Sequence, residues 1–105
     1  MYHLRNIKVV VKDFSVRDRH FVIVRDVNSY RYFAVEDKYI DYDGRLTQEL
    51  HGAQLFPSMD LEGCLTLVRN CVEIEYLEAQ GVERAAAFAQ VFGLPLTAEL
   101  RAAFN

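Results

Sequence analysis

Arginine and aromatic side chains are interspersed between residues 17 and 35. This segment is the first candidate for a binding surface. On an open sheet, arginines contact phosphates and aromatic rings stack on bases. The candidate nucleic-acid surface consists of Arg19, Arg25, Tyr30, Arg31 and Tyr32. Acidic residues lie among them, and cross-strand ion pairs are the ordinary explanation of such mixtures. Because the net charge is −3 and RNA-domain signatures are missing, nucleic acid is the less favoured partner.

A group of acidic residues follows, comprising Glu36, Asp37, Asp41, Asp43, Glu49 and, beside them, His51. If residues 37–43 form one strand, Asp37, Asp41 and Asp43 project from the same face. Carboxylates on one face can hold a divalent cation. The spacing does not match an EF-hand loop, however, and hairpin-turn chemistry explains Asp43-Gly44. We therefore predict no metal site.

The sequence contains no pattern that is typical of a catalytic centre. Its three histidines are scattered, and its two cysteines, Cys64 and Cys71, lie seven residues apart in a predicted helix. That spacing puts their Cα atoms about 10 Å apart, too far for a disulfide. Glycine-rich phosphate loops, nucleophile elbows and zinc-protease motifs are missing. We expect no catalytic residue and no cofactor, so the protein is predicted not to be an enzyme.

A long helix over about residues 58–80 is the surest predicted element. Its apolar residues cover an arc of about 200°, whereas a surface helix needs only about 100°. Either two elements of the same chain cover this arc, or one flank meets another protomer. Glu75 and Glu78 lie within the arc, either paired with an arginine such as Arg84 or Arg101, or solvated beyond the core. The candidate interface comprises Leu67, Ile74, Glu75 and Glu78.

Three β-rich segments in the N-terminal half must position the arginines. Residues 7–12 predict a strand with one buried face, residues 20–25 a central strand, and residues 30–35 a third strand. Residues 13–18 and 26–29 connect them, which favours an antiparallel meander. Residues 38–42 can form a fourth strand, residues 47–52 one helical turn, and residues 53–56 an edge strand or loop.

The C-terminal half changes to helical periodicity. Ser58 or Asp60 is the expected N-cap of the long helix, and Gly81 its stop. A second helix is expected from Val82 to Phe92, ended by Gly93, and a third from Thr97 to about Phe104. The predicted fold class is α+β, with a three- or four-stranded antiparallel sheet packed by the long helix and two shorter helices.

Composition and length complete the prediction. A chain of 105 residues predicts a single α+β domain over residues 1–105. No run approaches the roughly 20 apolar residues of a membrane span, and we expect a cytoplasmic protein without a membrane partner. The leading hypothesis is a non-enzymatic protein–protein interaction or regulatory module, with a homodimer as one form. The alternatives are a nucleic-acid accessory protein, and a small-molecule binder or enzyme with a pocket between sheet and helices.

Overall fold

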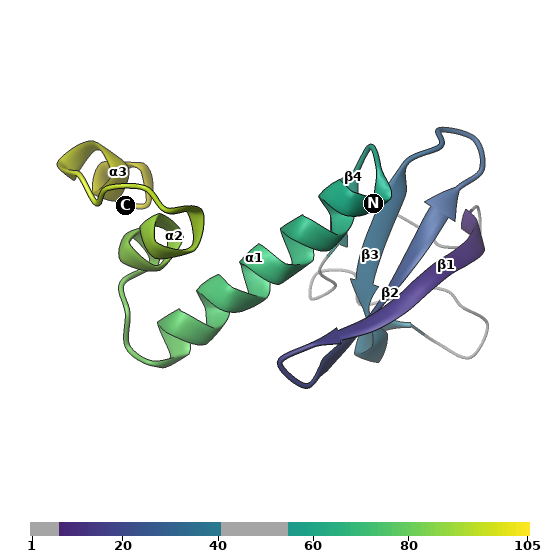
Figure 1. Ribbon diagram of the computed structural model, residues 1–105, viewed down its shortest axis with the longest axis horizontal. Helices are drawn as coiled ribbons and strands as arrows, with labels where there is room; N and C mark the ends of the chain where they lie inside the picture. Colours follow the sequence, from purple (N-terminus) through teal and green to yellow (C-terminus); the bar gives the residue numbers. More distant parts are fainter. Residues whose placement is uncertain (1–6, 41–54) are drawn as a thin grey trace. The chain divides into compact units, whose positions relative to one another are not determined.

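The predicted α+β architecture is confirmed (Figure 1). A computed structural model describes residues 7–40 and 55–105. Its elements, in chain order, are β1 (Ile7–Val16), β2 (Arg19–Asp26), β3 (Tyr32–Glu36), the 3₁₀ helix η2 (Asp37–Tyr39), β4 (Leu55–Ser58), α1 (Leu61–Ala79), α2 (Arg84–Phe92) and α3 (Ala98–Ala103). The chain divides within α1 into two compact units, residues 1–68 and 69–105. A single domain over residues 1–105 stays a prediction.

The first unit contains a four-stranded antiparallel sheet in the order β1-β2-β3-β4. The central position predicted for the second strand is confirmed, since β2 pairs with β1 on one side and β3 on the other. Successive residues of a strand point to opposite faces. Ile23 and Val24 are both buried, so the sheet has a covered surface on each side of β2.

The buried face predicted for the first strand is wrong over Val9 and Val11. Both side chains are exposed, with 45% and 38% of their accessible surface retained. The physical reason is twofold. β1 is an edge strand, and its register with β2 shifts between Ile7 and Val9 and again between Val10 and Lys12. Such bulges interrupt the alternation of inward and outward side chains on which the prediction depended.

The connection between β1 and β2 is shorter than predicted. Residues 13–16 belong to β1, and Val16 pairs with Arg19, so the loop is only Arg17-Asp18. Both loop residues have positive φ, 48° and 65°, as a type I′ hairpin turn requires. Arginine is an unusual residue for this conformation, which explains why the sequence did not predict so tight a turn.

The predicted strand over residues 38–42 is wrong where the structure describes it. Residues 37–39 form the 3₁₀ helix η2. At the end of η2, Tyr39 and the following Ile40 pack against the buried cluster of Val24, Phe33 and Val35. The chain thus leaves the sheet after Glu36 in order to cover one of its faces. The predicted hairpin at Asp43-Gly44 and the helical turn over residues 47–52 lie outside the described residues.

β4 confirms the edge-strand alternative at residues 55–56 and extends it to Ser58. Pro57 is tolerated because an edge strand can spare the backbone donor that proline lacks. The chain then enters α1 through Asp60, whose carboxylate accepts a hydrogen bond from the Gly63 amide at 2.6 Å. Asp60, rather than Ser58, is therefore the N-cap. Nearby, the buried Cys64 thiol donates to the Phe56 carbonyl oxygen at 3.1 Å.

The second unit is built from the end of α1, α2 and α3. The predicted stops are confirmed, because Gly81 and Gly93 have positive φ, 94° and 67°, where a residue with a Cβ would be strained. Thr97 caps α3 by accepting a hydrogen bond from the Leu100 amide at 3.1 Å. Few side chains of this unit are buried, namely Val72, Ala85, Ala87 and Ala89. No helix in the part of the chain that the structure describes is long and apolar enough to cross a membrane.

The β1–β2 turn gives a stability prediction. Replacing Arg17-Asp18 by Asn-Gly should raise the free energy of unfolding by about 1 kcal/mol, because these residues suit two positive φ angles. Urea denaturation measures the change. The matched control replaces both residues by alanine, which removes the same side chains but keeps a Cβ at each position, and should give no gain. Equal stability of the two double variants would contradict the assigned turn.

Candidate functional site

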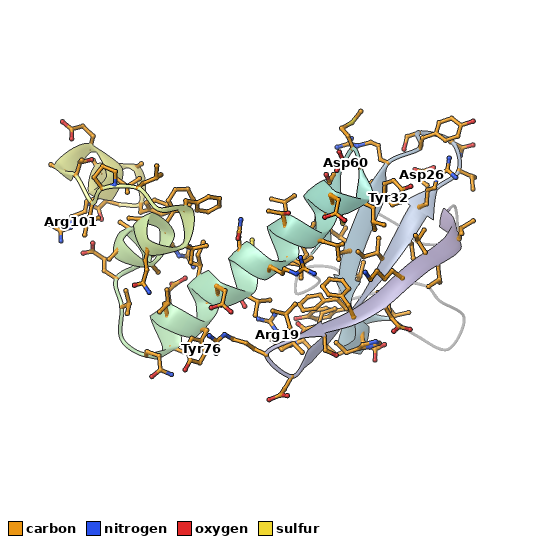
Figure 2. The ribbon with its side chains drawn as sticks, in the orientation of Figure 1. Arg19, Asp26, Tyr32, Asp60, Tyr76 and Arg101 are labelled. Atoms are coloured by element: carbon orange, nitrogen blue, oxygen red, sulfur yellow. The ribbon has the colours of Figure 1, made fainter. Side chains whose placement is uncertain are left out.

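The predicted Arg/Tyr surface is divided by the structure into separate places. Arg19 and Tyr32 lie at opposite ends of the sheet (Figure 2). Arg25 lies opposite Tyr32 in the β2–β3 register, so these two side chains share one face. Arg31 precedes Tyr32 and therefore belongs to the other face, where its guanidinium lies 5.9 Å from the Phe33 ring centroid. The five residues do not form one continuous basic surface.

Arg19 is neutralised by a carboxylate of the same sheet. Its Nε donates to Glu36 Oε2 at 2.9 Å and a terminal nitrogen donates to Oε1 at 3.0 Å. Glu36 is only 6% exposed, and Lys38 Nζ approaches its Oε1 at 3.5 Å. The hydrogen bonds from Arg19 are the largest cause that lowers the pKa of Glu36, against the opposing effect of burial. The cross-strand ion pair expected from the sequence is therefore present here.

Arg25, Tyr30 and Tyr32 do come together at the other end of the sheet. The Arg25 guanidinium lies 4.9 Å from the Tyr30 ring centroid, within the range of a cation–π contact. Tyr30 follows a turn organised by Asp26, whose carboxylate accepts a hydrogen bond from the Asn28 amide at 2.8 Å. This bond is the largest cause that lowers the pKa of Asp26. Asp26 thus shapes the turn, as its position in the sequence predicted.

The two described members of the acidic group, Glu36 and Asp37, each contact a basic side chain. Asp37 lies in η2 rather than on a strand, and its Oδ2 is 3.0 Å from His20 Nδ1. Glu36 is held by Arg19. Within residues 7–40 and 55–105, no three His, Cys, Asp or Glu side chains are grouped so that they could hold a metal ion. Asp41, Asp43, Glu49 and His51 lie outside the described residues.

Both cysteines are free, as their spacing predicted. Cys64 is fully buried, and burial raises the pKa of its thiol to about 11. The pKa of the Cys71 thiol is also raised, first by burial and then by the charge of Glu75. Since the thiolate is the nucleophile, neither environment activates a cysteine.

The four predicted interface residues of α1 have different surroundings. Leu67 is 39% exposed, whereas Ile74, Glu75 and Glu78 are half-buried. Glu78 forms an ion pair with Arg84, whose Nε lies 3.2 Å from both carboxylate oxygens. The pairing with Arg84 is therefore present, and Arg101 instead pairs with Glu83 at 3.0 Å. A role of these residues in an interface stays a prediction.

Exposed apolar residues for which no interface was predicted lie on α2, on the segment that follows it and at the end of α3. Phe88 contacts two rings, with centroid distances of 4.5 Å to Phe92 and 5.2 Å to Phe104. The α2–α3 surface consists of four exposed apolar residues, Phe92, Leu94, Leu96 and Phe104. The i, i+4 spacing of Phe88 and Phe92 was a usable signal. The approach of Phe104 from the next helix was not.

Comparison with known proteins gives no guide to this chain. No family model matches it, and neither a curated protein nor a solved structure does so.

The Arg19–Glu36 pair gives a prediction with a defined pH dependence. Glu36→Gln should lower the free energy of unfolding at pH 7 by about 2 kcal/mol, because a buried charge-assisted pair is broken. The folded-state pKa of Glu36 lies below its ordinary value of 4.5. The pair therefore stabilises fully above that value, and this stabilisation is lost as the pH falls through the folded pKa. Denaturant titrations from pH 7 downward should show the wild-type and variant stabilities converging.

Lys38→Met is the matched control, since it removes the other cation near the same carboxylate. Lys38 is mostly exposed, so its loss should cost less than about 1 kcal/mol. A Glu36→Gln variant as stable as the wild type at pH 7 would contradict the structural role of the pair.

The thiols give a chemical prediction. Iodoacetamide at pH 8 should label Cys64 no faster than the protein unfolds, because the thiol is buried and protonated. Mass spectrometry of native and urea-unfolded protein measures both cysteines. Rapid native labelling of Cys64 would contradict its placement in the core.

Proposed function

We propose that the protein is a non-enzymatic interaction module, and that the α2–α3 surface binds a second copy of the chain. The observation that carries this proposal is the exposure of Phe92, Leu94, Leu96 and Phe104 in one small unit, where the rings of Phe92 and Phe104 both contact Phe88. Large exposed apolar patches are typical of interaction sites. Aromatic residues are enriched where partner proteins contribute most binding energy.

The size of the second unit supports the same proposal. Residues 69–105 are fewer than the roughly 40 residues below which a domain usually needs a disulfide, a metal or oligomerisation. Cys71 is a free thiol, and three of the four buried side chains are alanines. Burying the α2–α3 surface against a partner would supply apolar burial that this unit lacks by itself.

The charges of this unit favour a second copy as the partner. Glu78 is paired with Arg84, and Glu83 with Arg101. Two identical surfaces meet in a two-fold dimer, so an unbalanced charge would face itself. Because these four charges are balanced within the chain, the contact brings little repulsion between like charges. Free, unactivated thiols suit a reducing compartment, and the proposed setting is the cytoplasm.

Light scattering coupled to size exclusion tests the proposal. The wild type should run at twice the chain mass of 12.1 kDa when concentrated, and dissociate on dilution. Leu94→Glu places a charge on the α2–α3 surface and should give a monomer at every concentration. Leu67→Glu is the matched control on the exposed flank of α1, and should leave the dimer intact.

The outcomes separate two surfaces. Dissociation by Leu67→Glu but not by Leu94→Glu would move the contact to the flank of α1 predicted from sequence. A monomeric wild type at all concentrations would refute the dimer. Circular dichroism of each variant confirms that a change in mass does not come from unfolding.

A further inference from the structure

One row of residues crosses the whole sheet at the end that carries the β2–β3 turn. Val9 of β1 lies beside Arg25 of β2, Arg25 beside Tyr32 of β3, and Tyr32 beside Ser58 of β4. We propose that this row, with Tyr30 beside it, is a docking site for an acidic peptide segment of a partner protein, whose carboxylate binds Arg25. The site lies in the first unit and does not depend on the α2–α3 surface.

Arg25 is prepared to receive a carboxylate. Its guanidinium carbon lies over the Tyr30 ring, 4.9 Å from the ring centroid. An arginine held against an aromatic ring in this way can bind a carboxylate through two parallel N–H hydrogen bonds. Arg19, Arg84 and Arg101 each have a carboxylate partner. Within the described ranges, no acidic side chain forms an ion pair with Arg25.

The neighbouring carboxylates are already engaged with backbone amides. Asp26 accepts from Asn28, and Asp60, two residues after Ser58, accepts from Gly63. Figure 2 shows Asp26, Tyr32 and Asp60 at this same end of the sheet. These bonds hold both acids in turn and cap positions, and within residues 7–40 and 55–105 neither forms an ion pair with Arg25.

Tyr30 is held in an unfavourable conformation that keeps its ring outside. Its φ is 59°, in the left-handed region that residues with a Cβ seldom adopt. The Tyr30 amide donates to the Asp26 carbonyl oxygen at 2.9 Å, and the Asp26 amide donates to the Arg31 carbonyl oxygen at 2.9 Å. The turn imposes this conformation, and the ring remains 65% exposed. Local strain that persists in a well-bonded turn is common where a side chain has a binding role.

The exposure and the charge of the row favour a peptide over a small molecule or a nucleic acid as the ligand. Val9 of the row is exposed, as are Tyr30 and Met59 beside it, while Arg25, Tyr32 and Ser58 are half-buried. A small ligand, in contrast, is normally buried over most of its surface. Nucleic acid requires several phosphate-neutralising cations along its path. The row offers one, Arg25, on a chain with a net charge of −3. An extended segment with an acidic side chain between apolar ones matches both the charge and the exposed apolar neighbours.

The test is an array of random dodecapeptides probed with the full-length labelled protein. Peptides retained by the wild type should be enriched in Asp and Glu. Arg25→Gln should abolish the enrichment, and Arg25→Lys should weaken it by about tenfold, since lysine keeps the charge but loses the planar fork. Arg69→Gln removes an exposed arginine from α1 and is the matched control, with an unchanged binding pattern.

Tyr30→Gly separates binding from folding. Glycine relieves the positive φ, so this variant should melt no lower than the wild type while losing retention of the acidic peptides. Absence of retained peptides, or retained peptides without acidic enrichment, would overturn the proposal. So would acidic retention that Arg25→Gln leaves unchanged. Binding of an oligothymidine strand that requires Arg25 and is lost steeply with salt would overturn it in favour of nucleic acid.

Discussion

The register between β2 and β3 is the constraint on which the first unit depends. It is fixed at one end by the Asp26 turn, where Asp26 and Arg31 are joined by a backbone hydrogen bond. At the other end it is fixed by the two hydrogen bonds from Arg19 to the buried Glu36. A slip by one residue would exchange the faces of the strand. Ile23 and Val24 are buried on opposite faces of the sheet. The register therefore determines which side chains are buried on each of the two faces.

The same constraint separates structural from available arginines. Arg19 and Arg25 are similar in the sequence, since each lies on β2 and points to the same face. The register gives Arg19 a carboxylate and gives Arg25 an aromatic ring. Arg31 is carried to the opposite face, where its Nε is buried and has no hydrogen-bond partner among the described residues. Electrostatic function is thus decided by pairing across strands rather than by the local density of charge.

Local signals predicted most boundaries of the helices, because a cap or stop needs only a few neighbouring residues. The start expected at Val82 is wrong, since α2 begins at Arg84 after Glu83, whose side chain makes no cap hydrogen bond. Asp60, Gly81, Gly93 and Thr97 all act as expected. Residues 37–39, the exposed valines of β1 and the ring of Phe104 depend on contacts distant in sequence, and the sequence predicted none of them correctly. Tyr30 is a related case. Its left-handed conformation is imposed by the turn around it. An asparagine or glycine at this position would have predicted a positive φ, whereas a tyrosine does not. The sequence therefore named Arg25, Tyr30 and Tyr32 as candidates but could not separate them from Arg19 and Arg31.

The most direct test of the β2–β3 register is whether Arg25 pairs with Tyr32. The row across the sheet and the Arg19–Glu36 pair both depend on this pairing. Nuclear Overhauser effects between the backbone protons of β2 and β3 in the free protein measure it. We predict cross-strand effects between Arg25 and Tyr32, together with upfield-shifted Arg25 side-chain protons beneath the Tyr30 ring. Effects that pair Arg25 with Arg31 or Phe33 would place Arg25 and Tyr32 on opposite faces of the sheet, and would contradict this register.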